Sequence, residues 1–559
     1  MGESPTFNSA ICCHDTRESC LAVIPARGGS KGIPRKNMRL MHGRPLIEYS
    51  IENALACRYI DTVVVSSDSD EILSFAEQFD QVECLDRSSE LSKDAVTLDP
   101  VVYDAVTRME QKLGRSFDTV VTLQPTSPLL SCETLEAALK RFTEEEWDSM
   151  ISVVNSPHLS WTKDETGTIV PEYTVRLNRQ QLPPRYLETG AFFISKRAYI
   201  TPTSRLGEKI SVFEVPSKES IDIDDREDWT ACEAVLARKK IAFRADGHKE
   251  LGLGHVYRAL TIAYTLIEHD VIFLTDASSH EGVERLRASN MPVVELNSEK
   301  EFFAWLKENR PDVLVNDTLD TSAQYVQHCK KYAERVVTFE DLGPGARFAD
   351  AVVNAIYEGA PKHSNTYVGK RYVCLRDEFL ISRPASFFEE VRRILVTFGG
   401  TDPLDLTSRI FRLAREMNAN GVKIVFDFVI GPGYSGSVYK GDPSHGIEVS
   451  RGVARVSDHM RSADLAICSQ GRTTFELATM GVPAIVLAQN ERERLHTFAQ
   501  MDNGFINLGL GNEVSDEDIS ATVYWLVSAG SIRREMRRLM LANDLKGGIS
   551  RVKMILLGE

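Results

Sequence analysis

The sequence lacks the features that define several protein classes. Among its 559 residues are 10 cysteines with no C-x-x-C pair, so neither a zinc knuckle nor a disulfide framework is indicated, and we expect reduced thiols. No window approaches the roughly 18 apolar residues that a membrane-spanning helix needs. Residues 1–20 lack the charged and apolar regions of a secretory signal. These absences predict a cytoplasmic protein with no membrane partner.

Basic residues are fewer than acidic ones. Lys and Arg total 65 against 80 Asp and Glu, which gives a net charge of −15, and the acidic residues are scattered along the chain. Duplex nucleic acid and anionic membranes bind clustered Lys and Arg, so we expect neither as a partner. Any polyanionic ligand must therefore be held by a local group of basic side chains.

The order of predicted elements indicates an α/β protein. Residues 1–19 are polar and aperiodic, which predicts a disordered tail. Short β-branched runs then alternate with longer amphipathic stretches, the pattern of a parallel sheet with helices on its faces. The strands expected in the first half are residues 21–25, 62–66, 119–123 and 150–154, and the helices are residues 46–57, 97–112 and 132–142. This is a doubly wound, Rossmann-like layout.

Two boundaries divide the chain. An amphipathic, charged segment at residues 228–240 runs directly into a new apolar strand at residues 241–244, which places a boundary near Arg238. The region 376–391 is irregular, and residues 393–398 begin a new series of strands and helices. We therefore predict domains at residues 20–238, 239–385 and 386–559, the last two being α/β lobes that face a cleft.

A glycine-rich basic loop follows the first predicted strand. Residues 26–37 read ARGGSKGIPRKN and combine three glycines with four basic side chains. Glycines let backbone N–H groups approach phosphate oxygens, and Arg and Lys neutralise the charge. The loop has neither Walker A nor G-x-G-x-x-G spacing, and a solvated basic loop is the alternative interpretation.

This loop resembles the nucleotide-binding signature of the CMP-sialic acid synthetases, cytidylyltransferases that join CTP to a nine-carbon acidic sugar (a nonulosonic acid) and release pyrophosphate. Further segments match that family in order: DRSSEL at 86–91 with Lys93-Asp94, LQPTSPL at 123–129, NRQQLP at 178–183 with ETGA at 188–191, and SIDID at 220–224. Ser88 and Thr189 depart from the family's usual proline and asparagine. The resemblance covers about residues 20–238 and implies a nucleotidyltransferase domain.

The resemblance also implies roles for individual residues. Arg27 and Lys36 would act catalytically by clamping phosphates. The CTP-binding residues would be Arg27, Gly28, Lys31, Lys36, Asn37 and Arg87, and the sugar-binding residues Gln124, Arg179 and Gln180. Asp222 and Asp224 would hold Mg²⁺, which prefers oxygen ligands; on a strand, residues two apart face the same side, although a solvated acidic turn is the alternative. Family members are often dimers, which implies a homodimer through the N-terminal domain.

A second constellation begins the second half of the chain. The expected strand at 241–244 is followed by LGLGHVYR at 251–258, which begins an amphipathic helix. Gly-x-Gly-His at a strand-to-helix turn places an imidazole beside backbone N–H donors, a favourable position for a diphosphate. A capping or surface histidine is the alternative. Later turns read GGTD at 399–402, SQGRTTFE at 469–476 and GVP at 481–483.

This order resembles the two-lobed GT-B glycosyltransferases over about residues 240–510 and, among proteins of that fold, the UDP-sugar hydrolase of the pseudaminic acid pathway. The resemblance implies that His255 is the general base that activates water for attack at the sugar C1. The implied UDP-binding residues are Gly254, Gly400, Ser469, Gly471, Thr473, Glu476 and Asn490. Acidic residues expected at strand ends near the cleft are Asp246, which could orient His255 or bind the sugar, and Asp317, Glu340 and Asp341. Arg472 and Glu491 depart from the family's pattern.

Together the two halves predict a bifunctional enzyme of nonulosonic acid biosynthesis, a Mg²⁺-dependent cytidylyltransferase fused to a hydrolase of a UDP-2,4-diacetamido-2,4,6-trideoxyhexose-type sugar. Two alternatives remain for the C-terminal half: a glycosyltransferase, or a non-catalytic module that binds UDP-sugar. The identity of the acid also stays open, because the basic loop resembles that of neuraminate and legionaminate synthetases, whereas the second half resembles the pseudaminate pathway.

Overall fold

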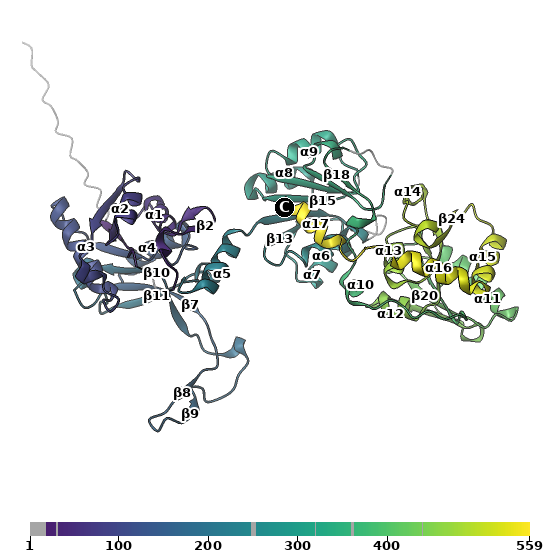
Figure 1. Cartoon of the computed structure of the whole chain (residues 1–559), viewed down its shortest axis with the longest axis horizontal. Helices are drawn as coiled ribbons and strands as arrows, with labels where there is room; N and C mark the ends of the chain where they lie inside the picture. The colour runs from purple at the N-terminus through teal and green to yellow at the C-terminus, as the bar shows by residue number, and fades with distance from the viewer. Residues whose placement is uncertain (1–17, 30–31, 248–252, 319, 359–362, 439) are drawn as a thin grey trace, which may run out of the picture. The chain divides into compact units, whose positions relative to one another are not determined.

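A computed structural model describes residues 18–29, 32–247, 253–318, 320–358, 363–438 and 440–559 (Figure 1). The chain divides into two compact units, Met1–Arg238 and Lys239–Glu559. The predicted tail lies outside the described residues as far as residue 17. Within the described ranges, no helix has both the length and the apolar character needed to span a bilayer.

The N-terminal unit is built on a seven-stranded sheet with the order β11-β7-β10-β6-β1-β4-β5. Its strands are β1 (Cys20–Pro25), β4 (Thr62–Ser67), β5 (Val82–Asp86), β6 (Thr119–Leu123), β7 (Ser149–Asn155), β10 (Tyr186–Lys196) and β11 (Ile210–Glu214). β10 runs antiparallel to both neighbours, β6 and β7, whereas the other pairings are parallel. The predicted parallel sheet is therefore a mixed one, still with a doubly wound parallel core.

Helices cover both faces of this sheet. They are α1 (Leu46–Ala56), α2 (Asp70–Ala76), α3 (Leu98–Leu113), α4 (Cys132–Glu144) and α5 (Arg226–Leu236), and a short hairpin joins β2 (Leu40–Met41) to β3 (Arg44–Pro45). One core cluster packs α1 and α4 on the sheet, and another packs Val102, Val106 and Met109 of α3 on the opposite face. The spacing of these α3 residues places them along one apolar stripe of the helix.

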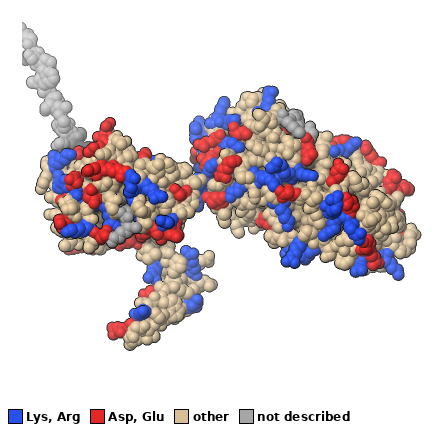
Figure 2. All heavy atoms as spheres, in the orientation of Figure 1, with Lys and Arg blue, Asp and Glu red and all other residues tan. Residues whose placement is uncertain are grey.

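An arm formed by residues 156–187 extends from the sheet between β7 and β10 (Figure 1). It carries the hairpin β8 (Trp161–Lys163) and β9 (Ile169–Pro171), which pair antiparallel. Trp161, Ile169 and Val175 are 54%, 57% and 62% exposed on this arm. In Figure 2 the arm, like the rest of the face shown, carries both acidic and basic side chains.

The C-terminal unit has two lobes, each built on a parallel sheet, as predicted. The first sheet has the order β14-β13-β12-β15-β16-β17-β18, and the second has β21-β20-β19-β22-β23-β24. The first-lobe strands are β12 (Lys240–Ala245), β13 (Asp270–Asp276), β14 (Val293–Leu296), β15 (Val313–Asp317), β16 (Arg335–Phe339), β17 (Ala351–Asn354) and β18 (Thr366–Val368). The second-lobe strands are β19 (Arg393–Thr397), β20 (Val425–Ile430), β21 (Ile447–Arg451), β22 (Leu465–Ser469), β23 (Ala484–Ala488) and β24 (Phe505–Leu510).

The helices of this unit follow its strands in alternation. Up to residue 381 they are α6 (Gly254–Ala263), α7 (His280–Ala288), α8 (Glu299–Asn309), α9 (Ala323–Cys329) and α10 (Asp377–Ile381). Beyond it they are α11 (Leu406–Ala419), α12 (Val456–Ser462), α13 (Thr473–Met480), α14 (Glu491–Arg494), α15 (Asp516–Ser528), α16 (Gly530–Leu541) and α17 (Gly548–Leu557).

Helix α17 returns to the first lobe. Its residues Val552 and Leu556 are fully buried in the cluster formed by β12, β15 and α6, and Lys239 Nζ donates to the Leu557 carbonyl over 2.8 Å. Figure 1 shows α17 beside β15. The predicted assignment of residues 386–559 to one lobe therefore has to be corrected, because residues 548–557 complete the core of the other lobe.

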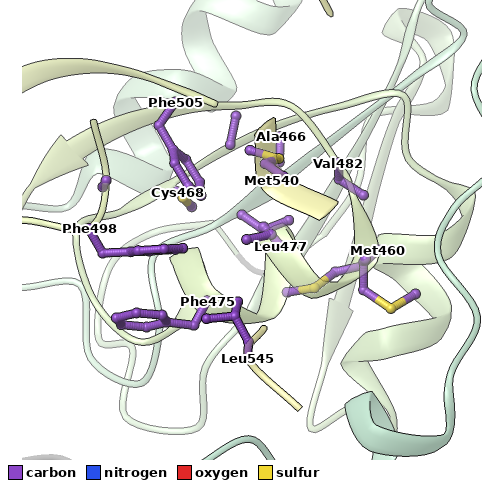
Figure 3. Packing of buried hydrophobic residues seen from close by; sticks show 14 of the residues in the cluster. Met460, Ala466, Cys468, Phe475, Leu477, Val482, Phe498, Phe505, Met540 and Leu545 are labelled. Carbon is purple, nitrogen blue, oxygen red and sulfur yellow. The ribbon is translucent and has the colours of Figure 1, made fainter. Parts of the chain in front are cut away.

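Helix α13 packs against a dense cluster of aromatic and Met side chains (Figure 3). The rings of Phe475 and Phe498 stack with centroids 4.2 Å apart, and Phe505 meets Phe498 edge-on at 5.6 Å. Met460 and Met540 are fully buried in the same cluster. Because flexible Met side chains fill the gaps between rigid rings, this packing fixes the position of the turn that precedes α13.

Candidate functional sites

Four parallel strands of the N-terminal unit end at the same edge of its sheet, and the predicted nucleotide loop begins there. At this edge lie all the buried side-chain atoms of the unit's described residues that make no hydrogen bond of normal geometry: Ser66 Oγ, Arg87 Nε and Nη2, Thr126 Oγ1 and Asp222 Oδ1. An unsatisfied buried polar group costs about 1–3 kcal/mol. Their concentration at one edge is what a site that receives polar ligand groups requires.

Arg87 is the main cation of this edge. It directly follows β5 and is only 5% exposed, and its nearest carboxylate oxygen, Asp68 Oδ1, is 3.6 Å from Nη2. Burial lowers the pKa of Arg87, an effect that the neighbouring Asp68 only partly opposes. Asp68 Oδ1 also accepts a 2.8 Å bond from the Gly28 N–H. The guanidinium therefore has donors available for an anion beside the basic loop.

The basic loop is held against the segment that contains Asp222 and Asp224. Lys36 Nζ donates to the Ile223 carbonyl over 2.5 Å, and burial lowers the pKa of Lys36 against the opposing charges of Asp224 and Asp222. A methyl group added at Gly32 would lie 2.4 Å from the Asp224 carbonyl oxygen, so only glycine allows this approach. The structure thus brings cations of the loop to the predicted metal-binding residues.

Other loop residues have partners of their own. Arg27 pairs with Asp94 at 2.8 Å, and Asn37, only 7% exposed, donates to the Arg27 carbonyl over 3.0 Å. Asn37 therefore braces the loop from inside, while the Arg27 pair is solvent-accessible and can exchange for a phosphate. The predicted CTP ligand Lys31 lies outside the described residues.

The segment with the two predicted metal ligands is extended but belongs to no strand, so that part of the prediction is wrong. Asp222 is half-buried and Asp224 is exposed, because Ile223 between them is fully buried and its N–H bonds to the Thr126 carbonyl at 2.9 Å. Burial raises the pKa of Asp222, whose Oδ1 is unsatisfied. The described residues hold no group of three or more His, Cys, Asp or Glu arranged to bind a metal. An unpaired carboxylate oxygen nevertheless fits a hard cation that takes its other oxygens from substrate and water.

Gln124 follows β6, at the end of a strand as the sequence predicts, and it lies near Asp222. A methyl group added at Gly190 would be 2.8 Å from Asp222 Oδ2 and 3.1 Å from Gln124 Nε2, and Gly190 has φ +70°. Thr189 points away: it is 2% exposed and its hydroxyl donates to Ser152 Oγ over 3.0 Å. The threonine that stands in place of the family's usual asparagine therefore changes a contact within the protein.

Arg179 and Gln180 are not brought to this edge. Both are exposed in a short turn, Arg179–Gln181, of the arm. Among the contacts of the described residues, neither side chain bonds to Gln124 or Asp222. Of the predicted sugar-binding residues, the structure thus places one at the nucleotide edge and two on the arm.

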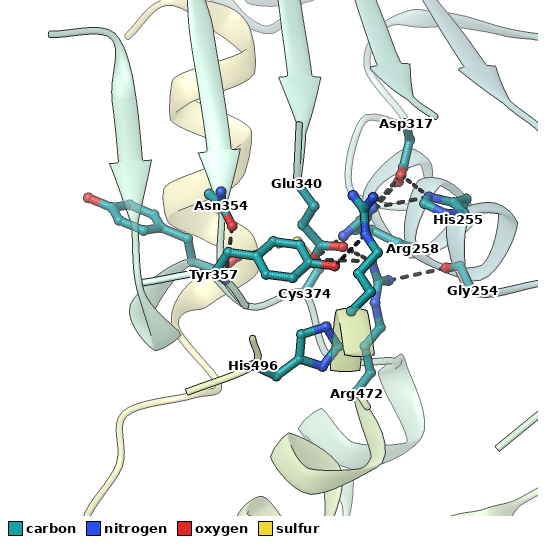
Figure 4. A network of polar contacts seen from close by, with 12 residues as sticks. Gly254, His255, Arg258, Asp317, Glu340, Asn354, Tyr357, Cys374, Arg472 and His496 are labelled. Carbon is teal, nitrogen blue, oxygen red and sulfur yellow. Dashed lines mark hydrogen bonds and ion pairs between the residues drawn. The ribbon is translucent and has the colours of Figure 1, made fainter. Parts of the chain in front are cut away.

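In the C-terminal unit, His255 forms a dyad with Asp317 (Figure 4). Nδ1 of His255, in the first turn of α6, lies 2.6 Å from Oδ1 of Asp317 at the end of β15. Burial alone would raise the pKa of Asp317, but Arg258 and His255 hold it well below its usual range. An ionised carboxylate can only accept, so Nδ1 carries the hydrogen of this contact, and Nε2 is the nitrogen that faces away from Asp317.

Arg258 joins this dyad to Glu340. It is 4% exposed, donates from Nε to Asp317 Oδ2 over 2.5 Å, and pairs through Nη1 with Glu340. Burial opposes its charge, yet the two carboxylates raise the pKa of Arg258. Glu340 is buried too, and Arg258 and Arg472 lower its pKa to about 2. Arg258 was not among the predicted site residues, although its position three residues after His255 puts both on one helix face.

Two other predicted carboxylates do not contact His255. Asp246 pairs with Arg244 at 3.0 Å and accepts from the Asp276 N–H at 2.7 Å. Asp341 accepts from the backbone N–H groups of Thr321 and Gly343 at 3.0 and 2.8 Å and so braces a loop. The residue that orients His255 is therefore Asp317 and not Asp246.

Most of the predicted UDP-binding residues of the second lobe gather where β19 and β22 end. A methyl group at Gly399, just before Gly400, would lie 3.8 Å from Ser469 Oγ, and one at Gly471 would lie 3.6 Å from it. Thr473 is the first residue of α13, whose start has no side-chain capping bond. The start of α11 is instead occupied by Asp402, which accepts from the Leu406 and Thr407 N–H groups at 3.0 and 2.7 Å. An anionic ligand therefore has α13, not α11, available to it.

Two of the predicted UDP-binding residues already bond to other residues of the protein. Glu476 pairs with Arg376 at 2.9 Å, and burial raises the pKa of Glu476 despite that partner. Asn490 caps α14 by accepting from the Glu493 N–H at 2.9 Å. Asn490 thus has the ordinary role of a helix cap in this structure.

Arg472 links the two lobes. From the turn before α13, its Nη1 donates to the Gly254 carbonyl over 3.1 Å, and its Nη2 lies 3.3 and 3.4 Å from the Glu340 carboxylate oxygens (Figure 4). The start of α6, the His255 dyad and the start of α13 therefore meet at one place in this unit.

Comparison with known proteins identifies the N-terminal half. A family model described as "Cytidylyltransferase" matches residues 21–170. The CMP-N,N'-diacetyllegionaminic acid synthase of Legionella pneumophila is 33% identical over 227 residues, which cover 39% of this chain and 95% of that protein. The chain belongs to the cytidylyltransferase family. The pseudaminic acid cytidylyltransferase of Campylobacter jejuni is 32% identical to this chain over 214 residues, which cover 37% of this chain and 92% of the relative.

Other similarities extend over different lengths. An uncharacterized protein of Methanocaldococcus jannaschii is 28% identical over 282 residues, which cover 46% of this chain and 57% of that protein, so the chain spans little more than half of that relative. Among solved structures, MurG of Acinetobacter baumannii aligns over 58% of this chain and 100% of its own at 14% identity, with a TM-score of 0.42.

Proposed function

We propose that the N-terminal unit transfers CMP from CTP to a nonulosonic acid and releases pyrophosphate. The observation that carries this proposal is the cluster of unsatisfied buried atoms, Arg87 Nε and Asp222 Oδ1 among them, beside the glycine-rich basic loop. The family relatives named for legionaminic and pseudaminic acid support the class of acceptor.

In this reaction a sugar hydroxyl attacks the α-phosphorus of CTP, and negative charge concentrates on phosphate oxygens. Arg27, Lys36 and Arg87 would neutralise that charge, with Gly28 and Lys31 cradling the phosphates. Asp222 and Asp224 would hold Mg²⁺, which when bound supplies further positive charge to the phosphates. Gln124 would contact the sugar, and Arg179 is suited to bidentate pairing with its carboxylate, beside Gln180.

A CTP-dependent pyrophosphate-release assay against neuraminic, legionaminic and pseudaminic acids tests this function. The Asp222→Asn variant should lose on the order of 100-fold in rate, because it removes the negative oxygen of the proposed cation site. Asp80→Asn changes an exposed aspartate of the same unit and should match wild type. Pyrophosphate release from none of the acids by wild type would refute the proposal, whereas an unchanged Asp222→Asn rate would remove only the cation site.

For the C-terminal unit we propose hydrolysis of a UDP-sugar of the 2,4-diacetamido-2,4,6-trideoxyhexose type. His255 Nε2 would take a proton from water as the water attacks the sugar C1, and Asp317 would stabilise the imidazolium. The UDP leaving group would lie against Gly254, Gly400, Gly471 and Thr473. Transfer to an acceptor sugar is the second candidate, because the same base next to a two-lobed cleft can deprotonate a sugar hydroxyl.

UDP release with ¹⁸O-labelled water separates these two reactions. Label at the sugar C1 supports hydrolysis, and UDP release only when an acceptor sugar is added supports transfer. We expect Asp317→Asn to lower the rate on the order of 1,000-fold, because an amide that donates to Nδ1 moves the hydrogen to Nε2. His280→Ala, an exposed histidine of the same lobe, is the control. Equal rates in wild type, His255→Ala and Asp317→Asn would exclude a catalytic dyad.

We also propose a cytoplasmic homodimer that forms through the arm of the N-terminal unit. Three large apolar side chains are more than half exposed there, at Trp161, Ile169 and Val175. Sedimentation analysis should show a dimer for wild type and a monomer for the double variant Trp161→Ser with Val175→Ser. Ile267→Ser changes a 90% exposed side chain of the other unit and should leave the dimer intact. A monomeric wild type would contradict this proposal.

A further inference from the structure

Arg472 is an unusual residue for its position. It occupies the turn between β22 and α13, where the resemblance to nucleotide-sugar enzymes predicts small side chains, and it extends to the opposite lobe. Its side chain is 28% exposed, so a ligand can reach part of it. A residue of this size in a nucleotide-binding turn either obstructs the ligand or contacts it.

The charges around Arg472 favour contact. Arg258 is a single buried cation that already serves two carboxylates, Asp317 and Glu340. Arg472 supplies the second positive charge and thereby balances the group. Without it, the Glu340 carboxylate would carry uncompensated negative charge toward the start of α13 and would repel an anion placed there.

The geometry of Arg472 leaves it able to take another partner. Its contacts with Glu340 are 3.3 and 3.4 Å long, whereas charge-assisted N–H···O bonds are usually about 2.7–2.9 Å. A guanidinium has five donors in a planar fork that fits phosphate oxygens. Arg472 can therefore remain next to Glu340 and still donate to a ligand, which a smaller residue in the same turn could not do.

We propose that Arg472 binds the diphosphate of a nucleoside diphosphate sugar and makes the acidic surroundings of His255 compatible with that ligand. The proposal rests on the UDP-sugar function of this unit. It adds a residue that binds the diphosphate and that the family resemblance does not supply. The contribution of Arg472 to affinity is specific to the diphosphate. The affinity for uridine, which has no phosphate, should not depend on Arg472.

Calorimetric titration of the full-length protein with UDP and with uridine tests the assignment. Arg472→Ala should weaken UDP binding about 10- to 100-fold, the range for losing a hydrogen bond to a charged group, and should change uridine binding less than twofold. Arg472→Lys keeps the charge without the fork and should recover part of the UDP affinity. Arg538→Ala removes a 64% exposed cation of the same lobe that is paired with Glu535, and it should match wild type.

The opposite results are equally clear. Tighter UDP binding by Arg472→Ala would show that the residue is a latch between the lobes that the ligand must displace, and would overturn the proposal. Equal weakening for UDP and uridine would show a purely structural role and would also overturn it. Wild type that binds UDP with the same affinity as Arg472→Ala refutes the assignment alone. Wild type that binds no UDP refutes the nucleotide-sugar function together with it.

Discussion

The two units each bury one arginine at a candidate site, and the two arginines have opposite surroundings. Arg87 and Arg258 are 5% and 4% exposed. Arg87 Nε and Nη2 make no hydrogen bond, and burial lowers the pKa of that residue. Arg258 is bonded to Asp317 and Glu340, and these carboxylates raise its pKa despite burial.

This difference indicates what each arginine does. The nearest carboxylate to Arg87, on Asp68, is 3.6 Å away, and Nε and Nη2 have no hydrogen bond of normal geometry, so a bound anion would supply contacts that the free protein lacks. Arg258 has its partners within the protein, so it holds Asp317 and, through it, His255 in place before any ligand arrives. One site is incomplete without substrate and the other is preorganised.

The largest effect is expected from Arg258→Met. Removing one partner from a buried ion cluster leaves two carboxylates without their cation and typically costs about 3–5 kcal/mol. Urea unfolding of the full chain would measure the loss, and hydrogen exchange of peptides from α6 and β15 would localise it to the C-terminal unit. Arg287→Met, which removes a 61% exposed arginine of the same lobe, should change stability by less than about 0.5 kcal/mol. If Arg258→Met were as stable as wild type, the proposed difference between Arg258 and Arg87 would be contradicted.

Arg87→Met should have the opposite effect on the stability of the free protein. The free protein should be as stable as wild type or more so, because an unsatisfied buried charge is removed. CTP affinity, measured by calorimetry, should fall about 10- to 100-fold, because the phosphates lose a charge-assisted donor. If Arg87→Met destabilised the free protein by as much as Arg258→Met, the two arginines would not differ as described.

The acid dependence of stability should also separate the units. Glu340 has a folded pKa of about 2, and that of Asp317 is lowered too, against unfolded values of about 4.3 and 3.9. The unfolded chain therefore binds more protons, so this contribution is complete above about pH 5 and is lost as the pH falls toward 2. Circular dichroism of urea unfolding between pH 5 and 2.5 should give a shallower dependence for Glu340→Gln than for wild type. If the stability of both proteins changed equally with pH, the ionisation of Glu340 would not contribute to the acid dependence.

The smallest effect is expected at Asn490. Its side chain caps α14, so Asn490→Ala should cost about 1 kcal/mol of stability and leave UDP affinity unchanged. Thermal unfolding and UDP titration would measure the two quantities on one sample. A tenfold loss of UDP affinity would instead support the ligand role that the sequence analysis assigned to this residue.

In the N-terminal unit, hydrophobic patterning predicted the parallel strands β1, β4, β6 and β7 but not β5 or β11. Residues 119–123 coincide with β6, and the strand expected at 62–66 differs from β4 by one residue. These strands are buried on both faces and read as continuous β-branched runs. β10 was missed, because its first three residues, Tyr186–Glu188, are exposed and the strand bends at a register shift where it passes from the arm to the sheet.

For the sites, sequence order placed residues at strand ends but could not pair them. The topology of parallel sheets puts Gln124 and His255 at carboxyl edges, as predicted, and it puts Arg87 there too, after β5, a strand that was not predicted. The partner of His255 is 62 residues away in the chain, and choosing Asp317 over Asp246 requires knowing which side chains face α6. Arg258 was passed over because a buried arginine is rare and reads from sequence as a surface residue.

Helix α17 has a consequence for how the protein is made. Residues 548–557 are synthesised after the whole second lobe, yet Val552 and Leu556 fill the core beneath β15, which carries Asp317. While the second lobe is emerging from the ribosome, one side of the first lobe therefore remains uncovered, with apolar surface that chaperones can recognise. A nonsense mutation just before residue 548 would accordingly damage the lobe that contains His255 and Asp317 rather than the lobe to which these residues are joined.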